Sequence, residues 1–384
     1  MAIWRTRSSR TIANHIRKCM NKGFMGGAVV NQSSWSSTLQ SCSLSSLSSH
    51  RLVPQNCSYL HPLPCNRATL FSLQRFKSSV AERQLDSFFS SDSDDEQYRE
   101  PGVLLWRGFT LQEFANQCFG NKADHGKGRQ MPIHYGSKEH NFFTISSPIG
   151  TQLPQAAGIA YSLKMDNKKA CAVSYIGDGG TSEGDFHAGL NFAAVMEAPV
   201  IFFCRNNGWA ISTHVSEQFR SDGIVVKGQG YGIRSIRVDG NDALAVYSAV
   251  SAAREMAINE QRPILVEALT YRIGHHSTSD DSTKYRALDE IDYWKLARNP
   301  VNRFRCWVQR NGWWSEQQET ELRKSIRKQL LQAIQVAEKT EKPPLTELFS
   351  DVYDHLPSNL LEQEKRLRGT ISRHPKDYPS DVSV

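Results

Sequence analysis

The feature that most constrains the fold is the stretch 171–209, in which two apolar segments flank a glycine-rich turn and a helix-like segment. Its residues predict a strand over 171–176, a helix over about 183–196 and a second strand over 199–204. Parallel strands joined through a helix end at the same edge of a sheet, so Asp178 and Asn207 are expected to meet although 29 positions separate them. The stretch therefore predicts a parallel α/β unit with a carboxylate and an amide oxygen at one edge.

These two oxygens suit a cation of the magnesium type, which takes few protein oxygens and completes its shell with water and phosphate oxygens. The turn 177–180 leads into a helix N-terminus, whose N–H groups favour phosphate. A metal-bridged diphosphate is therefore the ligand class that the stretch predicts. The simpler interpretation is that Gly-Asp-Gly is only a tight turn, which does not account for the Asn206-Asn207 pair after the next strand.

Residues 180–184, Gly-Thr-Ser-Glu-Gly, also match the G-x-S-x-G pattern of α/β-hydrolases. Asp239 and His276 follow Ser182 in the chain order of a hydrolase triad. This interpretation leaves Asp178 and the asparagine pair without a role, and no HGGG-like segment precedes the pattern. A hydrolase that uses Ser182 stays an alternative.

The basic character of the chain is confined to its N-terminal end. The whole chain carries a net charge of +7, but residues 1–80 contain 10 Lys or Arg, 16 Ser and no Asp or Glu. The rest has 36 basic and 39 acidic residues, a net charge of −3, which removes the main support for nucleic-acid binding. An Arg-rich, Ser-rich segment without acids predicts an organellar transit peptide, with the mitochondrion favoured over the plastid. A basic disordered arm is the alternative.

Three further features bound the class of protein. No apolar run is long enough to span a membrane, so no membrane contact is expected. Four of the eight cysteines lie in residues 1–80, and the others are widely spaced without a C-x-x-C pair, which indicates small core residues in a reducing compartment. We divide the chain into a transit peptide (1–80), a Ser/Asp-rich linker (81–96), an α/β domain (97–300) and a helical C-terminal region (301–384).

Strand and helix signals alternate from about 150 to 271. After the central stretch, strands are predicted over 235–238 and 263–269, with a helix over about 243–259 between them. Beyond 271 the strand signals stop, and Asn299-Pro300 and the Ser315 and Gln318 pair mark helix starts. The expected fold class is α/β: a parallel sheet with helices on both faces, followed by a helical C-terminal tail.

A second polar cluster, residues 271–282, follows the predicted strand 263–269 and should therefore face the same edge of the sheet. Arg272 can neutralise a diphosphate, and a histidine such as His276 can move protons or donate to phosphate. The simpler alternative is a solvated turn. The hydroxyl groups of the loop also suit regulation by phosphorylation, because a phosphate beside Asp280 would bring strong repulsion.

The chain resembles the alpha subunits of branched-chain 2-oxo acid dehydrogenases in six segments: GKGRQMPIHYG, TISSPIGTQLPQAAG, YIGDGG, FFCRNNGWAIST, SIRVDGNDA and TYRIGHHSTSDDS. The resemblance implies a thiamine-diphosphate-binding fold, a mitochondrial matrix protein, and an α2β2 heterotetramer with a beta subunit. The implied reaction is oxidative decarboxylation of the 2-oxo acids from Val, Leu and Ile, with acyl transfer to a lipoyl-bearing acyltransferase core. The pyruvate-specific alpha subunit is the alternative, and it differs at residues 129–132 and at Gly274-His275-His276, where it has His-Gly-His.

The resemblance also implies roles for individual residues. The diphosphate would be held by Tyr98, Arg99, Arg205 and His276, of which His276 would also be catalytic. Ser147, Gly179 and Gly180 would line thiamine diphosphate. Mg²⁺ would be bound by Asp178, Asn207 and the main-chain carbonyl of Trp209, where the family commonly has Tyr. A structural K⁺ would be bound by Ser146, Pro148, Thr151 and Gln152. Ser277 matches the site of a regulatory kinase and phosphatase, whereas the second phosphorylation position of the family falls at Ala287, which cannot be phosphorylated.

Two departures qualify the resemblance. In this family the glutamate that works the cofactor's aminopyrimidine comes from the beta subunit, so this chain alone is expected not to decarboxylate. Family members also carry a helical segment before the Tyr-Arg-Glu motif, and here only residues 81–97 stand in its place. Its loss is expected to expose apolar surface and weaken assembly. A truncated, non-catalytic variant that binds the beta subunit is therefore a further alternative.

Overall fold

The computed structural model describes residues 100–277, 279–350, 352–378 and 382–383. All of them belong to the unit Phe76–Val384. The predicted transit peptide and linker, together with Tyr98 and Arg99, lie outside the described residues.

The centre of the described chain is a four-stranded parallel sheet with the strand order β1-β2-β6-β5. Its strands are β1 (Ala172–Gly177), β2 (Val200–Asn206), β5 (Arg234–Asp239) and β6 (Ile264–Leu269). In the register of the strands, Gly177 of β1 pairs with Arg205 of β2, and Leu269 of β6 pairs with Asn206 of β2 and Asp239 of β5. The carboxyl ends of all four strands therefore meet at one edge, where the polar residues that follow them gather.

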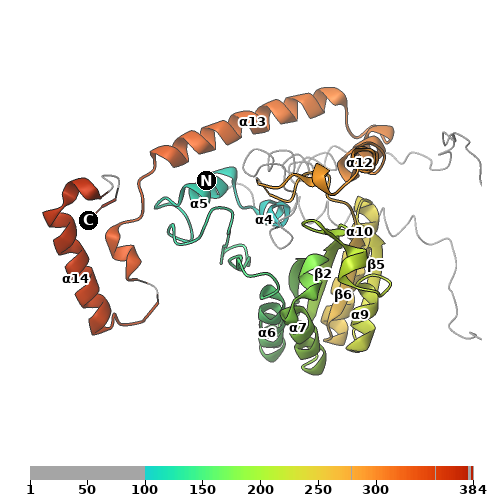
Figure 1. The fold of residues 1–384 in the computed structure, drawn as a ribbon, viewed down its shortest axis with the longest axis horizontal. Coiled ribbons are helices and arrows are strands. Elements are labelled where there is room, and N and C mark those ends of the chain that lie inside the picture. The colour runs from blue at the N-terminus through green and yellow to red at the C-terminus, as the bar shows by residue number, and fades with distance from the viewer. Residues whose placement is uncertain (1–99, 278, 351, 379–381, 384) are drawn as a thin grey trace, which may run out of the picture. The chain divides into compact units, whose positions relative to one another are not determined.

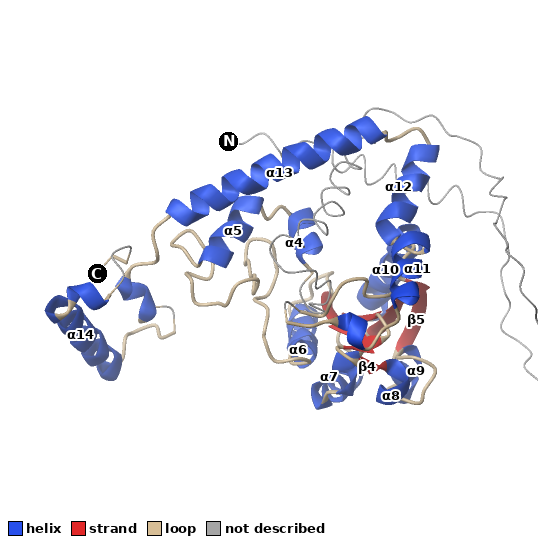
Figure 2. Cartoon of the chain, turned by 45° about the horizontal axis from the view of Figure 1, so that its top comes forward, coloured by secondary structure: helices blue, strands red, loops and turns tan. Residues whose placement is uncertain are grey.

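Helices cover both faces of this sheet, as the sequence predicted. Along β2, Phe202 and Cys204 pack with α6 (Gln152–Met165) and α7 (Gly184–Val195) in one buried cluster. Ile201 and Phe203 point the other way and pack with α10 (Ala243–Glu260) in a second cluster. A strand buried on both faces is apolar along most of its length, because each face needs its own apolar side chains. Figure 2 shows the strands in red with α6, α7, α9 and α10 around them.

Other helices flank the sheet and extend the chain: α4 (Pro101–Arg107), α5 (Leu111–Phe119), α8 (Val215–Gln218), α9 (Val225–Gly230), α11 (Leu288–Ala297), α12 (Pro300–Arg310), α13 (Glu316–Lys339) and α14 (Ser358–Arg373). Two predicted helix starts are confirmed. Asn299 caps α12, with Pro300 at its first position. Ser315 and Gln318 form a reciprocal capping box at α13. No strand follows β6 within the described residues, and the division of the chain at residue 300 stays a prediction.

Helix α13 lies along α5, more than 200 positions earlier in the chain. Ala333 and Ala337 pack against Ala115, and small side chains let the two backbones approach closely. The amide of Gln112 donates to the Ala333 carbonyl at 3.2 Å, and the amide of Asn121 donates to the Ala337 carbonyl at 3.1 Å. The N-terminal described segment is therefore held by a helix close to the C-terminus.

The predicted elements differ from the structure mainly at their ends. β1 begins one residue later than predicted, so Cys171 precedes the strand and is only half-buried, whereas Cys204 is fully buried in β2. The turn after β1 is a short 3₁₀ helix, Gly179–Ser182, that leads into α7. A small hairpin of β3 (Trp209–Ala210) and β4 (Thr213–His214) follows β2 and was not predicted.

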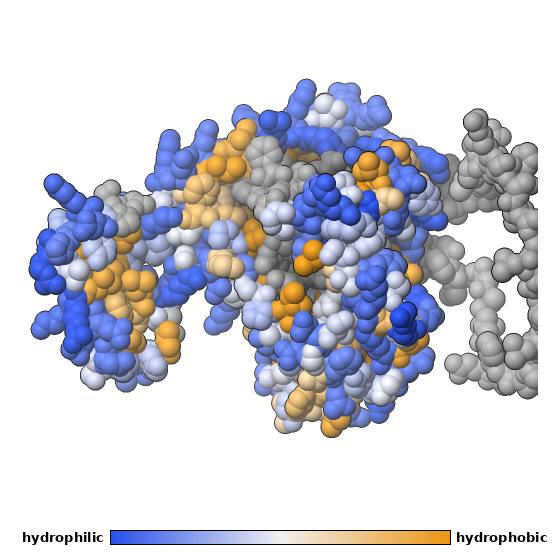
Figure 3. All heavy atoms as spheres, viewed as in Figure 1, coloured by the Kyte–Doolittle hydropathy of each residue, from blue (hydrophilic) through white to orange (hydrophobic). Residues whose placement is uncertain are grey.

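Several large apolar side chains are exposed. Figure 3 shows them in orange, with groups over α7 and over α14. On α7, Phe192 and Val195 are 59% and 75% exposed, and near the C-terminus Val352 and Leu361 are 75% and 53% exposed. None of the described helices is long and apolar enough to cross a membrane. Contiguous apolar patches on a surface are a common feature of protein–protein interfaces.

Candidate active site

Asp178 and Asn207 meet at the carboxyl edge of the sheet, as predicted. The main-chain N–H of Asn207 donates to one carboxylate oxygen of Asp178 at 3.1 Å. Asp178 is 0% exposed and Asn207 is 6% exposed. The side-chain oxygen of Asn207 accepts from the Trp209 N–H at 3.0 Å, which folds the chain back over the site. The sequence thus located the pair, because parallel topology alone brings these positions together.

Gln218 completes this polar group and was missed by the sequence analysis. Its amide nitrogen donates to the second carboxylate oxygen of Asp178 at 3.1 Å. Its own oxygen is buried and has no hydrogen-bond partner among the described residues. A buried oxygen without a donor is costly, and a bound cation or donor would remove that cost. Gln218 follows the β3–β4 hairpin, and no sequence pattern marks that path.

Gly179 and Gly180 are needed because the chain is crowded at the turn. A Cβ atom on Gly179 would lie 2.6 Å from Cβ of Ala210, and one on Gly180 would lie 2.7 Å from Cγ1 of Ile176. The same position on Gly180 is 3.2 Å from Ile149, which belongs to the predicted cofactor-lining loop. Three segments therefore lie in contact around Gly179 and Gly180: the glycine turn, the β3 strand and the 146–152 loop.

Lys227 also supports the turn and was not predicted. Its ammonium group donates to the main-chain and side-chain oxygens of Thr181 at 3.3 and 3.2 Å. The hydroxyl of Thr181 donates in turn to the Asp178 carbonyl at 2.8 Å. Burial lowers the pKa of Lys227, since the aromatic rings of Phe186 and Phe219 flank its ammonium group.

The loop 146–152 gathers oxygen atoms. The Thr151 hydroxyl oxygen lies 3.1 Å from both the Ser146 hydroxyl and the Pro148 carbonyl, either of which can accept its proton. The Gln152 amide nitrogen donates to the Tyr175 carbonyl at 3.0 Å, while its oxygen is buried without a partner among the described residues. A set of neutral oxygens with one lacking a donor has the chemistry of a site for a hard cation.

Arg205 lies near the end of β2, at the same edge of the sheet. Its guanidinium lies 3.0 Å from the carboxylate of Glu100, and both side chains are mostly buried. Glu100 is the last residue of the Tyr-Arg-Glu motif, whose Tyr98 and Arg99 lie outside the described residues. The ion pair therefore ties the end of that motif to β2.

The second cluster lies against the first. Arg272 is 2% exposed and donates to the Ile211 carbonyl, in the β3–β4 hairpin, at 2.7 Å. It also donates to the Tyr285 hydroxyl at 3.1 Å and lies 3.4 Å from Nδ1 of His276. The ring centroids of Tyr285 and Trp209 are 5.6 Å apart. The prediction that this loop faces the edge after β2 is confirmed.

Tyr285 and Asp280 hold the loop in shape. The Tyr285 hydroxyl donates to Asp280 at 2.6 Å, and the His276 N–H donates to the same oxygen at 2.8 Å. Burial and the bond to Asp280 raise the pKa of Tyr285 to about 12. Burial alone would raise the pKa of Asp280, but the two donors outweigh it and keep that pKa below its ordinary value. Ser277 lies in this loop, with its hydroxyl 3.3 Å from that of Ser279.

The two residues that would complete the alternative hydrolase triad have other partners. Asp239 accepts from Arg303 at 2.9 Å, across the start of α12. His276 lies beside Arg272 and Asp280. The aspartate and the histidine are thus each engaged with other charged groups.

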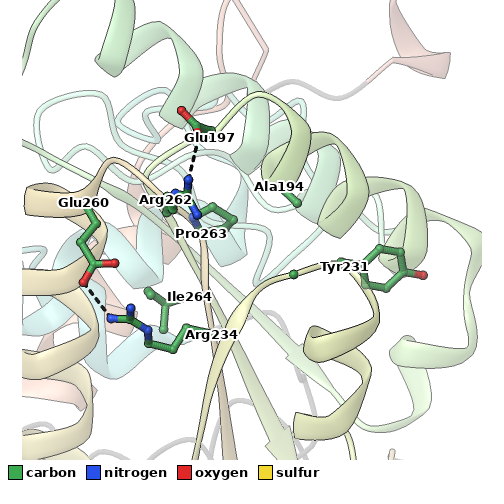
Figure 4. Close-up of a pocket in the computed structure, with 9 residues that line it drawn as sticks. Ala194, Glu197, Tyr231, Arg234, Glu260, Arg262, Pro263 and Ile264 are labelled. Atoms are coloured by element: carbon green, nitrogen blue, oxygen red, sulfur yellow. Dashed lines mark hydrogen bonds and ion pairs between the residues drawn. The ribbon is translucent and has the colours of Figure 1, made fainter.

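A separate pocket of about 300 Å³ lies at the opposite edge of the sheet, where β5 and β6 begin (Figure 4). Its charged groups pair with each other: Arg234 with Glu260 at 2.7 Å, and Arg262 with Glu197 at 3.0 Å. These side chains are all at least 40% exposed. The polar residues after the strands, rather than this charge-balanced pocket, form the candidate site.

Comparison with known proteins agrees with this geometry. Residues 79–346 match the family model of the dehydrogenase E1 component. The chain is 79% identical over 288 residues to the mitochondrial 2-oxoisovalerate dehydrogenase subunit alpha 1 of Arabidopsis thaliana, covering 75% of this chain and 61% of that protein. It is 54% identical over 285 residues to the mitochondrial alpha subunit of Mus musculus 2-oxoisovalerate dehydrogenase, covering 74% of this chain and 64% of that protein.

A third relative carries a different name. The chain is 76% identical over 211 residues to a putative 2-dehydropantoate 2-reductase of Arabidopsis thaliana, covering 55% of this chain and 58% of that protein. A nicotinamide cofactor is commonly held by a G-x-G-x-x-G turn, and this chain contains no such pattern. The chain spans less than two thirds of the length of each of these relatives. The family model covers well over half of the chain, and the protein therefore belongs to the dehydrogenase E1 component family.

Proposed function

We propose that this chain is the alpha subunit of a branched-chain 2-oxo acid dehydrogenase that acts on 2-oxoisovalerate and its relatives. The observation that carries the proposal is the buried Asp178 and Asn207 pair at the carboxyl edge of a parallel sheet, next to a glycine turn. Two relatives are named as alpha subunits of 2-oxoisovalerate dehydrogenase, which favours branched-chain substrates over pyruvate.

Asp178, Asn207 and the main-chain carbonyl of Trp209 would bind Mg²⁺. No group of three or more His, Cys, Asp or Glu side chains that could hold a metal occurs within the described residues. A cation bound by one carboxylate therefore needs oxygens from its ligand, as Mg²⁺ obtains from a diphosphate. The unpartnered oxygen of Gln218 beside Asp178 fits such a site.

The cofactor would also contact other residues of the chain. Thiamine diphosphate, when bound, supplies a carbon nucleophile for the 2-oxo group and stores the electrons left when CO₂ departs. Diphosphate contacts are proposed for Tyr98, Arg99, Arg205 and His276, and cofactor-lining contacts for Ser147, Gly179 and Gly180. Ser146, Pro148, Thr151 and Gln152 would bind a structural K⁺, which the unpartnered oxygen of Gln152 supports.

His276 is proposed as the catalytic residue of this chain. Its main-chain N–H is fixed by Asp280 and its ring lies beside the buried Arg272. An imidazole at this place can accept or donate a proton near the diphosphate. Ser277, next in sequence, would be the regulated hydroxyl, since an added phosphate would repel Asp280.

We further propose a beta subunit as the partner, in an α2β2 heterotetramer that passes the acyl group to a lipoyl-bearing acyltransferase core. The exposed apolar groups on α7 and near α14 support a stable protein partner. The mitochondrial names of the relatives and the acid-free segment 1–80 support a mitochondrial location.

The test uses the full chain produced together with a beta subunit of 2-oxoisovalerate dehydrogenase. Mg²⁺-dependent binding of thiamine diphosphate is measured by calorimetry, and CO₂ release from 2-oxoisovalerate by a coupled assay. Asp178→Asn should weaken binding by about 100-fold or more, and Gln218→Leu by about 10-fold to 100-fold because it only supports Asp178. Glu183→Gln, an exposed carboxylate nearby, is the control and should change neither quantity.

The chain alone should release no CO₂ from 2-oxoisovalerate. CO₂ release by the purified chain without a beta subunit would contradict the proposal that the reaction needs both subunits. Binding of the cofactor that is equally strong in Asp178→Asn and in the unmodified protein would refute the metal site itself.

A further inference from the structure

The side-chain amide of Gln218 has only one orientation that its surroundings allow. Its nitrogen lies 3.1 Å from a carboxylate oxygen of Asp178 and 3.2 Å from the Thr213 carbonyl. Both of these oxygens accept hydrogen bonds, so the NH₂ group faces them, and a flipped amide would set its own oxygen against two acceptors. The NH₂ group therefore serves Asp178 and Thr213, and the oxygen Oε1 lies on the other side of the amide carbon.

Oε1 of Gln218 lies beside the glycine turn and lacks a donor. It is 4.0 Å from the position that a Cβ atom of Gly179 would take, it is shielded from solvent, and it has no hydrogen-bond partner among the described residues. Main-chain N–H groups of the site have other acceptors: that of Asn207 donates to Asp178, and that of Trp209 donates to the Asn207 side chain. A buried acceptor without a donor is costly, and a bound molecule that brings a donor removes this cost.

The ligands proposed for this site differ in whether they can supply that donor. The oxygens of an ionised diphosphate only accept, so they cannot bond to Oε1. A water bound to Mg²⁺ can donate, and the charge of the cation makes its O–H groups stronger donors. Mg²⁺ gives up its waters reluctantly and demands nearly ideal octahedral geometry. Asp178, Asn207 and the Trp209 carbonyl, together with diphosphate oxygens, would leave room in this octahedron for a water.

We propose that Gln218 is a positioning residue that accepts a hydrogen bond from a water on Mg²⁺ and thereby makes the site prefer Mg²⁺ to Ca²⁺. Its nitrogen holds Asp178 and its oxygen holds the water, so one amide orients two ligands of the cation. Ca²⁺ takes a variable number of oxygens in flexible geometry, so an acceptor in one fixed direction stabilises its waters less. This inference rests on the proposed function, because it takes Mg²⁺ with thiamine diphosphate as the ligand.

The test measures the affinity for thiamine diphosphate by calorimetry, with Mg²⁺ and separately with Ca²⁺, in the full chain produced with a beta subunit. Gln218→Leu should weaken binding about 10-fold to 100-fold with Mg²⁺, because the donor and the acceptor are both lost. With Ca²⁺ the loss should be smaller, so the preference for Mg²⁺ should fall about 10-fold, the effect of one good hydrogen bond. An equal loss with both cations would show that Gln218 only supports Asp178 and would overturn the inference. If Gln218→Leu does not assemble with the beta subunit, the unbranched Gln218→Met is measured in its place.

The chain offers a matched control in Gln112, at the contact between α5 and α13. The amide nitrogen of Gln112 also donates to a side-chain oxygen and to a main-chain carbonyl, those of Asn116 at 3.0 Å and Ala333 at 3.2 Å. Gln112→Leu should leave the ratio of the affinities with Mg²⁺ and Ca²⁺ unchanged. A fall in this ratio as large as in Gln218→Leu would show a general effect of losing a half-buried amide and would contradict the assignment.

A second readout examines the cation itself. Mn²⁺, which takes the same octahedral oxygen ligands as Mg²⁺, is bound with thiamine diphosphate to the full chain carrying ¹³C-labelled glutamine. Electron–nuclear double resonance should show exchangeable water protons on Mn²⁺, with a coupling that changes in Gln218→Leu. A strong ¹³C coupling that disappears in Gln218→Leu would show that the amide oxygen binds the cation directly, which would overturn the role of the water.

The proposed function is tested separately by Asp178→Asn. If that variant loses cofactor binding while Gln218→Leu keeps the full preference for Mg²⁺, the function stands and only this inference is wrong.

Discussion

Replacing Glu267 by glutamine should destabilise the protein strongly, although the change is nearly isosteric. Glu267 is 0% exposed in the centre of β6. One of its oxygens accepts from the Asn206 amide at 2.8 Å and the Ile224 N–H at 2.9 Å. The other accepts from the Val225 N–H at 2.9 Å and from Arg237 at 3.0 Å. Four donors from three other segments thus share one carboxylate.

In Glu267→Gln, a single oxygen remains and can keep Asn206 and Ile224. The new NH₂ group then faces the N–H groups of Val225 and Arg237, and both lose their acceptor. An unsatisfied buried donor costs about 1–3 kcal/mol, and removing one partner of a buried ion pair costs about 3–5 kcal/mol. Arg237 keeps Asp222 at 3.0 Å and its side chain is 30% exposed, so we expect a total near the lower end, about 3 kcal/mol.

Thermal unfolding followed by circular dichroism checks this value. At about 2–4 °C for each kcal/mol in a protein of this size, the melting temperature should fall by roughly 6–12 °C. Glu260→Gln is the control, because Glu260 pairs with Arg234 at 2.7 Å but is 40% exposed, and it should cost less than about 1 kcal/mol. Equal melting temperatures for the two variants would refute the reasoning that the buried carboxylate is fully engaged.

Three further changes have defined outcomes. Gly223→Ala should lower the melting temperature, because Gly223 has φ +71° and a Cβ there would lie 2.6 Å from Glu267. Tyr285→Phe removes a donor from Asp280, so trypsin should cut the 272–286 loop faster. Because the pKa of Asp280 is lowered on folding, Asp280 stabilises the unmodified protein fully above pH 3.8, its ordinary pKa. This stabilisation is lost as the pH falls through the lowered pKa. In Tyr285→Phe, carboxyl NMR should show that Asp280 titrates closer to 3.8. Ser315→Ala removes the cap of α13 and should cost about 1 kcal/mol in urea unfolding.

The fold could be predicted from the sequence because its signals are local. The predicted strand 263–269 and β6 differ by one residue, and the predicted helix 243–259 and α10 also differ by one. Apolar runs and caps are properties of neighbouring residues. The meeting of Asp178 and Asn207 could also be predicted, since parallel topology places the ends of successive strands at one edge.

The residues that support the site could not be predicted, because their contacts join distant positions of the chain. Gln218 reaches Asp178 across 40 positions, and Glu267 reaches Asn206 across 61. A buried glutamate in an apolar strand and a glutamine after a hairpin have no periodicity that marks their partners. The left-handed backbone of Ile133, with φ +66°, could not be predicted either, because a β-branched residue is the last type expected at positive φ.

The contact between α5 and α13 has a consequence for the order in which the chain is made. The loop that follows α5 is tied to residues much later in the chain by Lys122 with Glu341 at 2.8 Å and Lys127 with Glu347 at 2.7 Å. The ribosome makes these acidic partners 219 and 220 positions after the lysines. The four-stranded sheet, whose last described strand ends at Leu269, can therefore form before the partners of Lys122 and Lys127 have been made.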